Sequence, residues 1–150
     1  MKLKFIKDDR SLLTYLILGF LTGGIYSLWY IHRLAKDVNE MCGDYGKRTS
    51  GVVAYIFLSI ITLGGYSVFW WYRVADMISY TAKKRDVDIS LSPSVVMLSF
   101  VLGYFLLGMA SWVGIYNVFQ GANVLAEDYN RRHRTKSYLD EQRSLNAEEI

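Results

Sequence analysis

The chain has 150 residues, a formal net charge of +3 and a hydrophobic fraction of 52%. This length suits one domain, and so small and scattered a positive charge argues against binding to nucleic acid. Cys42 is the only cysteine, which excludes an intramolecular disulfide. With only His32 and His133 available as further ligands, neither a zinc site nor another cofactor is expected.

The first expected element covers residues 11–41. It contains a block without charge, from Leu12 to Ile31, and about 20 apolar residues is the length typical of a membrane segment. After Gly24 the pattern becomes one-sided, because apolar residues then recur on one half of a helical wheel. These residues are Ile31, Leu34, Ala35, Val38 and Met41. The pattern predicts a wholly apolar helix followed by an amphipathic helix.

The second expected element, residues 51–82, repeats the first. Placing Ser11–Met41 over Gly51–Thr81 without a gap aligns two shared frames, Thr-x-Gly-x-Tyr-Ser and Arg-x-Ala. The charge-free block here runs from Gly51 to Tyr72, and an apolar half follows at the same helical phase. It consists of Trp71, Val74, Ala75 and Ile78. Duplication explains the ungapped match better than chance does.

The third expected element, residues 92–126, matches less closely in sequence. A shift of 84 positions from the first element places Gly108 on Gly24 and Ser111 on Ser27, but Ala110 replaces the tyrosine. The helical phase is again the same. Its apolar half consists of Ile115, Val118, Phe119, Ala122, Leu125 and Ala126. This shared phase indicates a third repeat.

A polar tail, residues 127–150, follows the repeats. Its basic residues Arg131, Arg132 and Arg134 are candidates for contact with anionic lipid, at about 1 kcal/mol each; the alternative is an ordinary cytoplasmic stop signal. The end of the tail is polar and weakly helical in pattern. We therefore expect a membrane domain over residues 1–126 and a cytoplasmic tail over 127–150.

A glycine and a serine mark the change of pattern inside each repeat. The glycines are Gly24, Gly64 and Gly108, and the serines three residues later are Ser27, Ser67 and Ser111. Glycine ends helices in the left-handed conformation, and serine is a preferred N-cap. The sequence thus predicts a helix, a break and a second helix; the alternatives are a kinked continuous helix or glycines used for close packing. Because Leu63 matches Gly23, helical backbone is expected at that position.

The predicted fold is an all-α integral membrane protein of three tandem helix–glycine break–helix repeats. The first helix of each repeat has about 13 to 15 residues, or roughly 20 Å, which is less than the hydrocarbon core of about 30 Å. Basic residues flank every repeat. Re-entrant hairpins place all these flanks in the cytoplasm, as the positive-inside rule prefers, whereas three single spans would divide them evenly.

The segment from Ser59 to Arg73, SIITLGGYSVFWWYR, resembles the signature of a bacterial membrane family catalogued as domain of unknown function four-two-three-four. The first copy keeps five of its positions, namely Thr22, Gly24, Tyr26, Trp29 and Arg33. The resemblance covers residues 11–82 well and 94–126 faintly. It implies a bacterial integral membrane protein, and it implies no established activity and no catalytic residues.

Aromatic and basic residues next to the breaks are the candidate contact sites. The aromatic ones form clusters that could be a platform for lipid headgroups or for a partner; the alternative is an interfacial aromatic belt. They are Tyr26, Trp29, Tyr30, Tyr66, Phe69, Trp70, Trp71 and Tyr72. Arg33 and Arg73 could bind phosphate headgroups, or they could snorkel or pair with Asp37 and Asp76.

The apolar blocks contain no charged residue, so no buried acid or base is available for catalysis, and an enzyme is not expected. We expect a small protein of the bacterial cytoplasmic membrane that acts by binding, as an assembly, accessory or membrane-organising subunit. Its expected partners are the lipid bilayer and either another membrane protein or further copies of itself. The alternative is an oligomeric channel or transporter built from broken helices. The lack of intramembrane charge favours the first interpretation.

Overall fold

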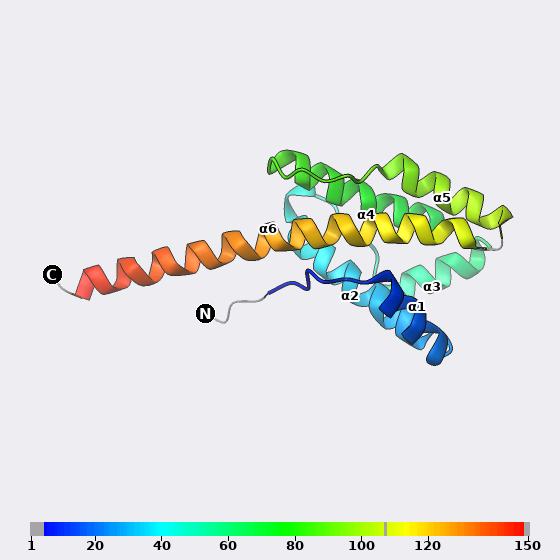
Figure 1. Cartoon of the computed structure of the whole chain (residues 1–150), viewed down its shortest axis with the longest axis horizontal. Coiled ribbons are helices and arrows are strands. Elements are labelled where there is room, and N and C mark those ends of the chain that lie inside the picture. The colour runs from blue at the N-terminus through cyan, green and yellow to red at the C-terminus, as the bar shows by residue number, and fades with distance from the viewer. Residues whose placement is uncertain (1–4, 107, 149–150) are drawn as a thin grey trace.

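The computed structural model describes residues 5–106 and 108–148, and every regular element in these ranges is a helix (Figure 1). Residues 1–4 of the expected membrane domain, 149–150 of the expected tail, and Leu107 lie outside the described residues. The elements are α1 (Leu12–Leu21), α2 (Ile25–Met41), the short 3-10 helix η1 (Gly43–Tyr45), α3 (Val52–Ile61), α4 (Gly65–Lys84), α5 (Pro93–Phe105) and α6 (Met109–Glu148).

The helices form three antiparallel hairpins: α1–α2, α3–α4 and α5–α6. In the first, Tyr15 of α1 packs edge-on against Tyr30 of α2, with 5.3 Å between ring centroids. Nearer the break, a Cβ added to Gly19 would lie 2.6 Å from the Ser27 hydroxyl oxygen. Contacts that converge on the break in this way require the chain to fold back on itself. Figure 1 shows all three breaks at one end of the molecule.

The amphipathic helices α2, α4 and α6 supply most of the core. Every residue that the helical wheel assigned to an apolar half is buried. At the centre, Trp71 of α4 stacks on Phe100 of α5, with ring centroids 5.6 Å apart, and Phe119 of α6 is fully buried beside them. The apolar halves therefore face one another and α5, inside the protein.

Two of the apolar helices, α1 and α3, lie on the outside of this core, whereas α5 contributes Val96 and Phe100 to it. Within α1 only Tyr15 and Gly19 are buried, and α3 has no buried residue. Among the described residues, no helix combines the length and the apolar character needed to cross a membrane. At 10 residues each, α1 and α3 are about 15 Å long.

Asparagine side chains attach the segments that precede two of the hairpins. Asn39 on α2 accepts a hydrogen bond from the Thr49 amide, 2.7 Å away, just before α3. The equivalent Asn123 on α6 bonds both the amide and the carbonyl of Arg10, just before α1, at 2.9 and 3.0 Å. Two turns further along α6, Asn130 binds Ile6 in the same two-sided way. These amides fix the N-terminal segment along α6.

The expected tail continues the second helix of the third repeat. Helix α6 has 40 residues and continues from the third repeat through residue 148, so no break occurs at residue 126. Its last part extends away from the hairpins in Figure 1. The weakly helical pattern is thus part of a regular helix whose first half is anchored in the core.

Candidate functional site

The three breaks share one backbone geometry. Gly24 has φ 92° and ψ −11°, Gly64 has φ 91° and ψ −12°, and Gly108 has φ 86°. Each glycine amide donates a hydrogen bond of 2.7 Å to the carbonyl five residues earlier, which closes the end of the preceding helix. A side chain is disfavoured at this φ and ψ, so the glycine that the three repeats share is required by the turn.

The residue before the shared glycine was predicted to be helical, and that prediction is wrong. Gly23 has φ 59° and Leu63 has φ 49°, so both are left-handed. This φ lies close to the left-handed well that an L-residue can occupy at a moderate cost. The position therefore accepts leucine, whereas the next one demands glycine.

Threonines, not the serines, cap the second helices of the first two hairpins. The Thr22 hydroxyl accepts a hydrogen bond of 3.0 Å from the Tyr26 amide, and Thr62 accepts one of 2.8 Å from the Tyr66 amide. Both threonines also donate to the last turn of the preceding helix, at 2.7 Å. Each threonine thus satisfies backbone groups on both sides of the break.

The serines predicted as caps lie inside the second helices. The Ser67 hydroxyl instead lies 2.8 Å from that of Tyr55 on the preceding helix, and the Ser27 hydroxyl packs against Gly19 of the preceding helix. In the third hairpin, Ser111 packs so closely on Gly103 that a Cβ there would lie 2.0 Å from its hydroxyl oxygen. The serines therefore hold the two helices of a hairpin together.

Large apolar side chains are exposed around the breaks. Phe20 is 88% exposed, Leu63 85% and Phe105 77%. The neighbouring exposed residues are Leu21, Ile25, Ile60, Ile61, Tyr104, Leu106 and Met109. We call this end of the molecule, with the three breaks at its centre, the apolar end.

The predicted aromatic contact residues separate into two groups. Trp29 is half exposed, and Tyr26 and Tyr66 are partly buried. Trp70 and Trp71, contrary to the expectation, are only 1% and 2% exposed, and the Trp70 indole N–H donates to the Ser50 carbonyl at 3.2 Å. Because it lies in the core, Trp70 is not available for contact with lipid or a partner.

Neither arginine near the breaks pairs with the carboxylate that its sequence neighbourhood offers. Arg33 is exposed and lies over the Trp29 ring, with its guanidinium carbon 5.7 Å from the centroid. Asp37 is instead bound by Arg10 at 2.9 Å. In the second repeat, the Arg73 Nε is buried without a hydrogen-bond partner, and Asp76 accepts from the Tyr45 hydroxyl at 2.5 Å.

Two of the three tail arginines have a carboxylate partner within the helix. Asp128, which is 3% exposed, accepts hydrogen bonds from Arg132 at 2.7 Å and Arg131 at 3.1 Å. Burial alone raises the pKa of Asp128, but these hydrogen bonds outweigh it and hold the pKa below its usual value. Arg134 lies over the ring of Phe5.

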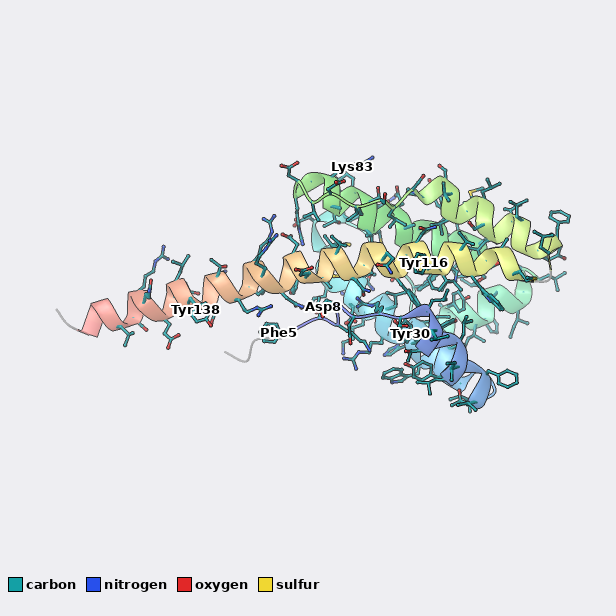
Figure 2. The ribbon with its side chains drawn as sticks, in the orientation of Figure 1. Phe5, Asp8, Tyr30, Lys83, Tyr116 and Tyr138 are labelled. Carbon is teal, nitrogen blue, oxygen red and sulfur yellow. The ribbon has the colours of Figure 1, made fainter. Side chains whose placement is uncertain are left out.

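A polar cavity of about 190 Å³ lies where the N-terminal segment passes α2. It is lined by Lys7, Arg10, Tyr26, Trp29, Tyr30, Arg33, Leu34 and Asp37. Figure 2 labels Tyr30 close to the point where the N-terminal segment enters α1. The sequence pattern named Tyr26, Trp29, Tyr30 and Arg33 as contact candidates but not Lys7 and Arg10. The asparagine clamps that position the N-terminal segment join residues more than 100 positions apart.

Among the residues that the structure describes, no cluster of three or more histidine, cysteine or acidic side chains is placed to hold a metal ion. The two features left as candidate sites are the apolar end and the polar cavity beside α2.

Comparison with known proteins assigns the chain to a family but to no activity. The family described as "Domain of unknown function (DUF4234)" matches residues 10–54, which contain the first hairpin, and residues 50–123, which contain the second hairpin and most of the third. No curated protein and no solved structure matches significantly. The two family matches cover most of the chain and confirm the resemblance seen in the sequence, so the protein belongs to the DUF4234 family.

Proposed function

We propose that the protein is a membrane-anchored binding protein whose three hairpins dip into the bilayer of the bacterial cytoplasmic membrane. The apolar end lies in the hydrocarbon, and the linkers and the end of α6 lie in the cytoplasm. The protein has no chemistry of its own in this proposal and serves as an assembly, accessory or membrane-organising subunit.

The observation that carries the proposal is the exposure of the apolar helices. Most large apolar side chains of α1, α3 and α5 face outward, while the less apolar helices supply most of the core. Transfer of each such side chain out of water is worth about 1.5–3 kcal/mol, and an apolar patch of this kind marks an interaction surface. A bilayer covers all three hairpins at once.

The breaks are built in a way that suits a lipid environment. A helix end inside hydrocarbon leaves backbone groups that cost several kcal/mol each when unpaired. Here the Gly24 and Gly64 amides bond the preceding helices, and the Thr22 and Thr62 hydroxyls accept amide hydrogens of the next helices. The chain thus turns around while keeping these groups satisfied.

The direction of the hairpins supports re-entrant insertion over three single spans. Both ends of each hairpin lie opposite its break, and basic residues flank each hairpin at those ends. At about 15 Å, α1 and α3 reach roughly halfway across a hydrocarbon core of about 30 Å. All flanks then meet the same leaflet, in agreement with the positive-inside rule.

Membrane extraction tests the anchor. We expect the protein to stay in the membrane pellet through carbonate and high-salt washes and to be released by detergent. Recovery in the wash supernatant would refute the anchor. An Ile60→Glu/Leu63→Glu/Phe105→Glu variant places carboxylates at exposed positions of the apolar end, and we expect it to lose retention while its helical circular dichroism in detergent is preserved.

Cysteine accessibility tests the topology. Lys47, Asp88 and Ser144 are exposed positions in the first linker, the second linker and α6, and each is replaced singly by cysteine in a Cys42→Ser background. A membrane-impermeant thiol reagent should label none of them in intact cells and all of them after permeabilisation. Leu63→Cys, at the apolar end, should stay unlabelled in both conditions. Labelling of Asp88→Cys alone, or of the other two without it, would replace hairpins by single spans.

A flux assay separates this proposal from the channel or transporter alternative. Purified protein is reconstituted into liposomes loaded with small ions and solutes, and release is compared with protein-free liposomes. A binding protein leaves release at background. Release that scales with the amount of protein would support an oligomeric pore or carrier instead.

A further inference from the structure

We propose that the cavity between the N-terminal segment and α2 is a binding site for a phosphate group. It is distinct from the apolar end, and its phosphate chemistry does not depend on membrane insertion. Only one of its two possible sources, the headgroup of an anionic phospholipid, rests on the proposed function; the other is free phosphate.

The charge of the cavity favours an anion. Lys7, Arg10 and Arg33 line it against a single carboxylate, Asp37. That carboxylate is already engaged by Arg10, at 2.9 Å. Lys7 has only a loose contact of 3.6 Å with the exposed Asp9, and no ion pair joins Arg33 to a carboxylate among the described residues. Two cations are therefore available to a ligand.

Tyr30 supplies the second, independent observation. Its side chain lines the cavity, the residue is 6% exposed, and its hydroxyl is buried without a hydrogen-bond partner. An unsatisfied buried hydroxyl costs about 1–3 kcal/mol, and buried polar groups in folded proteins are nearly always paired. A phenol keeps its proton at neutral pH, so it would donate to a phosphate oxygen.

The second repeat offers an internal comparison at the positions of Tyr30 and Arg10. Trp70 occupies the position of Tyr30 and donates to the Ser50 carbonyl at 3.2 Å. Ser50 occupies the position of Arg10, and its hydroxyl lies 2.6 Å from that of Tyr66. At these two positions the second repeat makes its own hydrogen bonds, whereas the first repeat has a cation and an unpaired hydroxyl.

The cavity is held in place from outside. The Asn123 clamp fixes the backbone of Arg10, and the Arg10 guanidinium is bound by Asp37 and donates to the Lys7 carbonyl. The Arg10 side chain is only 2% exposed. Trp29 provides an aromatic wall that carries Arg33 over its ring. Such preorganised donors lose little conformational entropy when a ligand binds.

The test uses full-length protein in a neutral detergent, stripped of lipid. Inorganic phosphate is titrated by calorimetry, and bound phosphatidylglycerol and phosphatidylcholine are measured by native mass spectrometry. We expect saturable binding of phosphate, of phosphatidylglycerol in preference to phosphatidylcholine, or of both. Tyr30→Phe and Arg33→Gln should each weaken binding about tenfold, since each removes one hydrogen bond to a charged ligand.

Two variants serve as matched controls. Tyr66→Phe removes the equivalent-repeat hydroxyl that bonds Ser50, and Lys83→Gln removes an exposed cation far along α4; both should bind as the unmodified chain does. Without ligand, Tyr30→Phe should melt at the same or a higher temperature, because it removes an unpaired group, while Tyr66→Phe should melt lower.

The results assign the source. A lipid headgroup is identified if inorganic phosphate displaces bound phosphatidylglycerol. It is also identified if phosphatidylglycerol binds and inorganic phosphate does not, and both variants bind the lipid about tenfold more weakly. Binding of inorganic phosphate alone identifies a soluble phosphate. Absence of both, or equal binding by Tyr30→Phe, Arg33→Gln and the unmodified chain, overturns the site. Carbonate retention of the two variants should be unchanged, so a failure of the membrane anchor is read separately.

Discussion

Composition suggests that the most apolar helices, α1, α3 and α5, should form the core. The amphipathic helices α2, α4 and α6 supply most of it instead. Helix α3, which is almost wholly apolar, has no buried residue, while α4 contributes a long buried face that includes Trp71, Val74 and Ile78. The difference teaches that hydrophobicity alone does not locate the core of this protein. An outer layer of apolar helices around an amphipathic core is the order expected where lipid surrounds the protein.

The largest expected effect separates the buried core from the exposed apolar helices, and it is measured by truncating one phenylalanine in each. Phe119→Ala removes a fully buried ring of α6, and we expect a loss of about 3–5 kcal/mol of stability. Phe57→Ala removes a ring of α3 that is 66% exposed and should change stability in detergent by less than about 0.5 kcal/mol. Thermal unfolding followed by circular dichroism measures both. Equal losses would contradict the assignment of the layers.

The break between the two helices of a hairpin should lose more stability on substitution of the shared glycine than on substitution of the residue before it. Gly64→Leu places a side chain at φ 91° and ψ −12° and should cost about 1–3 kcal/mol. Gly23→Leu should cost clearly less, because Leu63 already occupies the matching position at φ 49°. The melting temperatures of the two variants in detergent decide this. If the order were reversed, the shared glycine would not be the residue that the turn requires.

The threonine caps should contribute a smaller amount. Thr22→Val and Thr62→Val keep the side-chain shape but remove the acceptor for the next helix, and each should cost about 1 kcal/mol. Thr135→Val on the exposed part of α6 controls for the substitution itself and should be close to neutral. No difference between the capping threonines and Thr135 would show that the break is held by the glycine alone.

Sequence periodicity predicted the core but not the contacts between repeats. One helical wheel per repeat sufficed for residues such as Leu34, Val74 and Phe119, because each amphipathic helix turns one face to the same centre. Trp70 was misassigned because α4 is covered on more than one side, which a single-helix pattern cannot express. The caps were assigned to serines by distance from the glycine, whereas a threonine two residues before the glycine reaches across the break.

The polar cavity was only partly predictable for a related reason. Tyr30 and Arg33 lie near the first break in sequence, but Lys7 and Arg10 reach them only through clamps from Asn123 and Asn130 on α6. No local pattern encodes a contact between the two ends of the chain. A charged residue directly before a charge-free block, as Arg10 is, was the one available signal.

The smallest expected effect concerns Cys42, at the end of α2 away from the apolar end. It is 1% exposed, and burial raises its pKa to about 11. At pH 8 the thiolate fraction should be about a hundredfold lower than for a thiol of pKa 9. We expect N-ethylmaleimide to modify Cys42 slowly in the folded protein and rapidly after unfolding in denaturant, as measured by mass spectrometry. Lys47→Cys, in the same linker but exposed, should react quickly in the folded state.

Since the folded pKa is the higher one, the thiol's contribution to stability is complete below pH 9 and is lost as the pH rises through 11. Fast labelling of Cys42 at pH 8 would mean that the end of the core opposite the apolar end opens readily. The amphipathic helices would then be packed less tightly than the buried faces of α2 and α4 require.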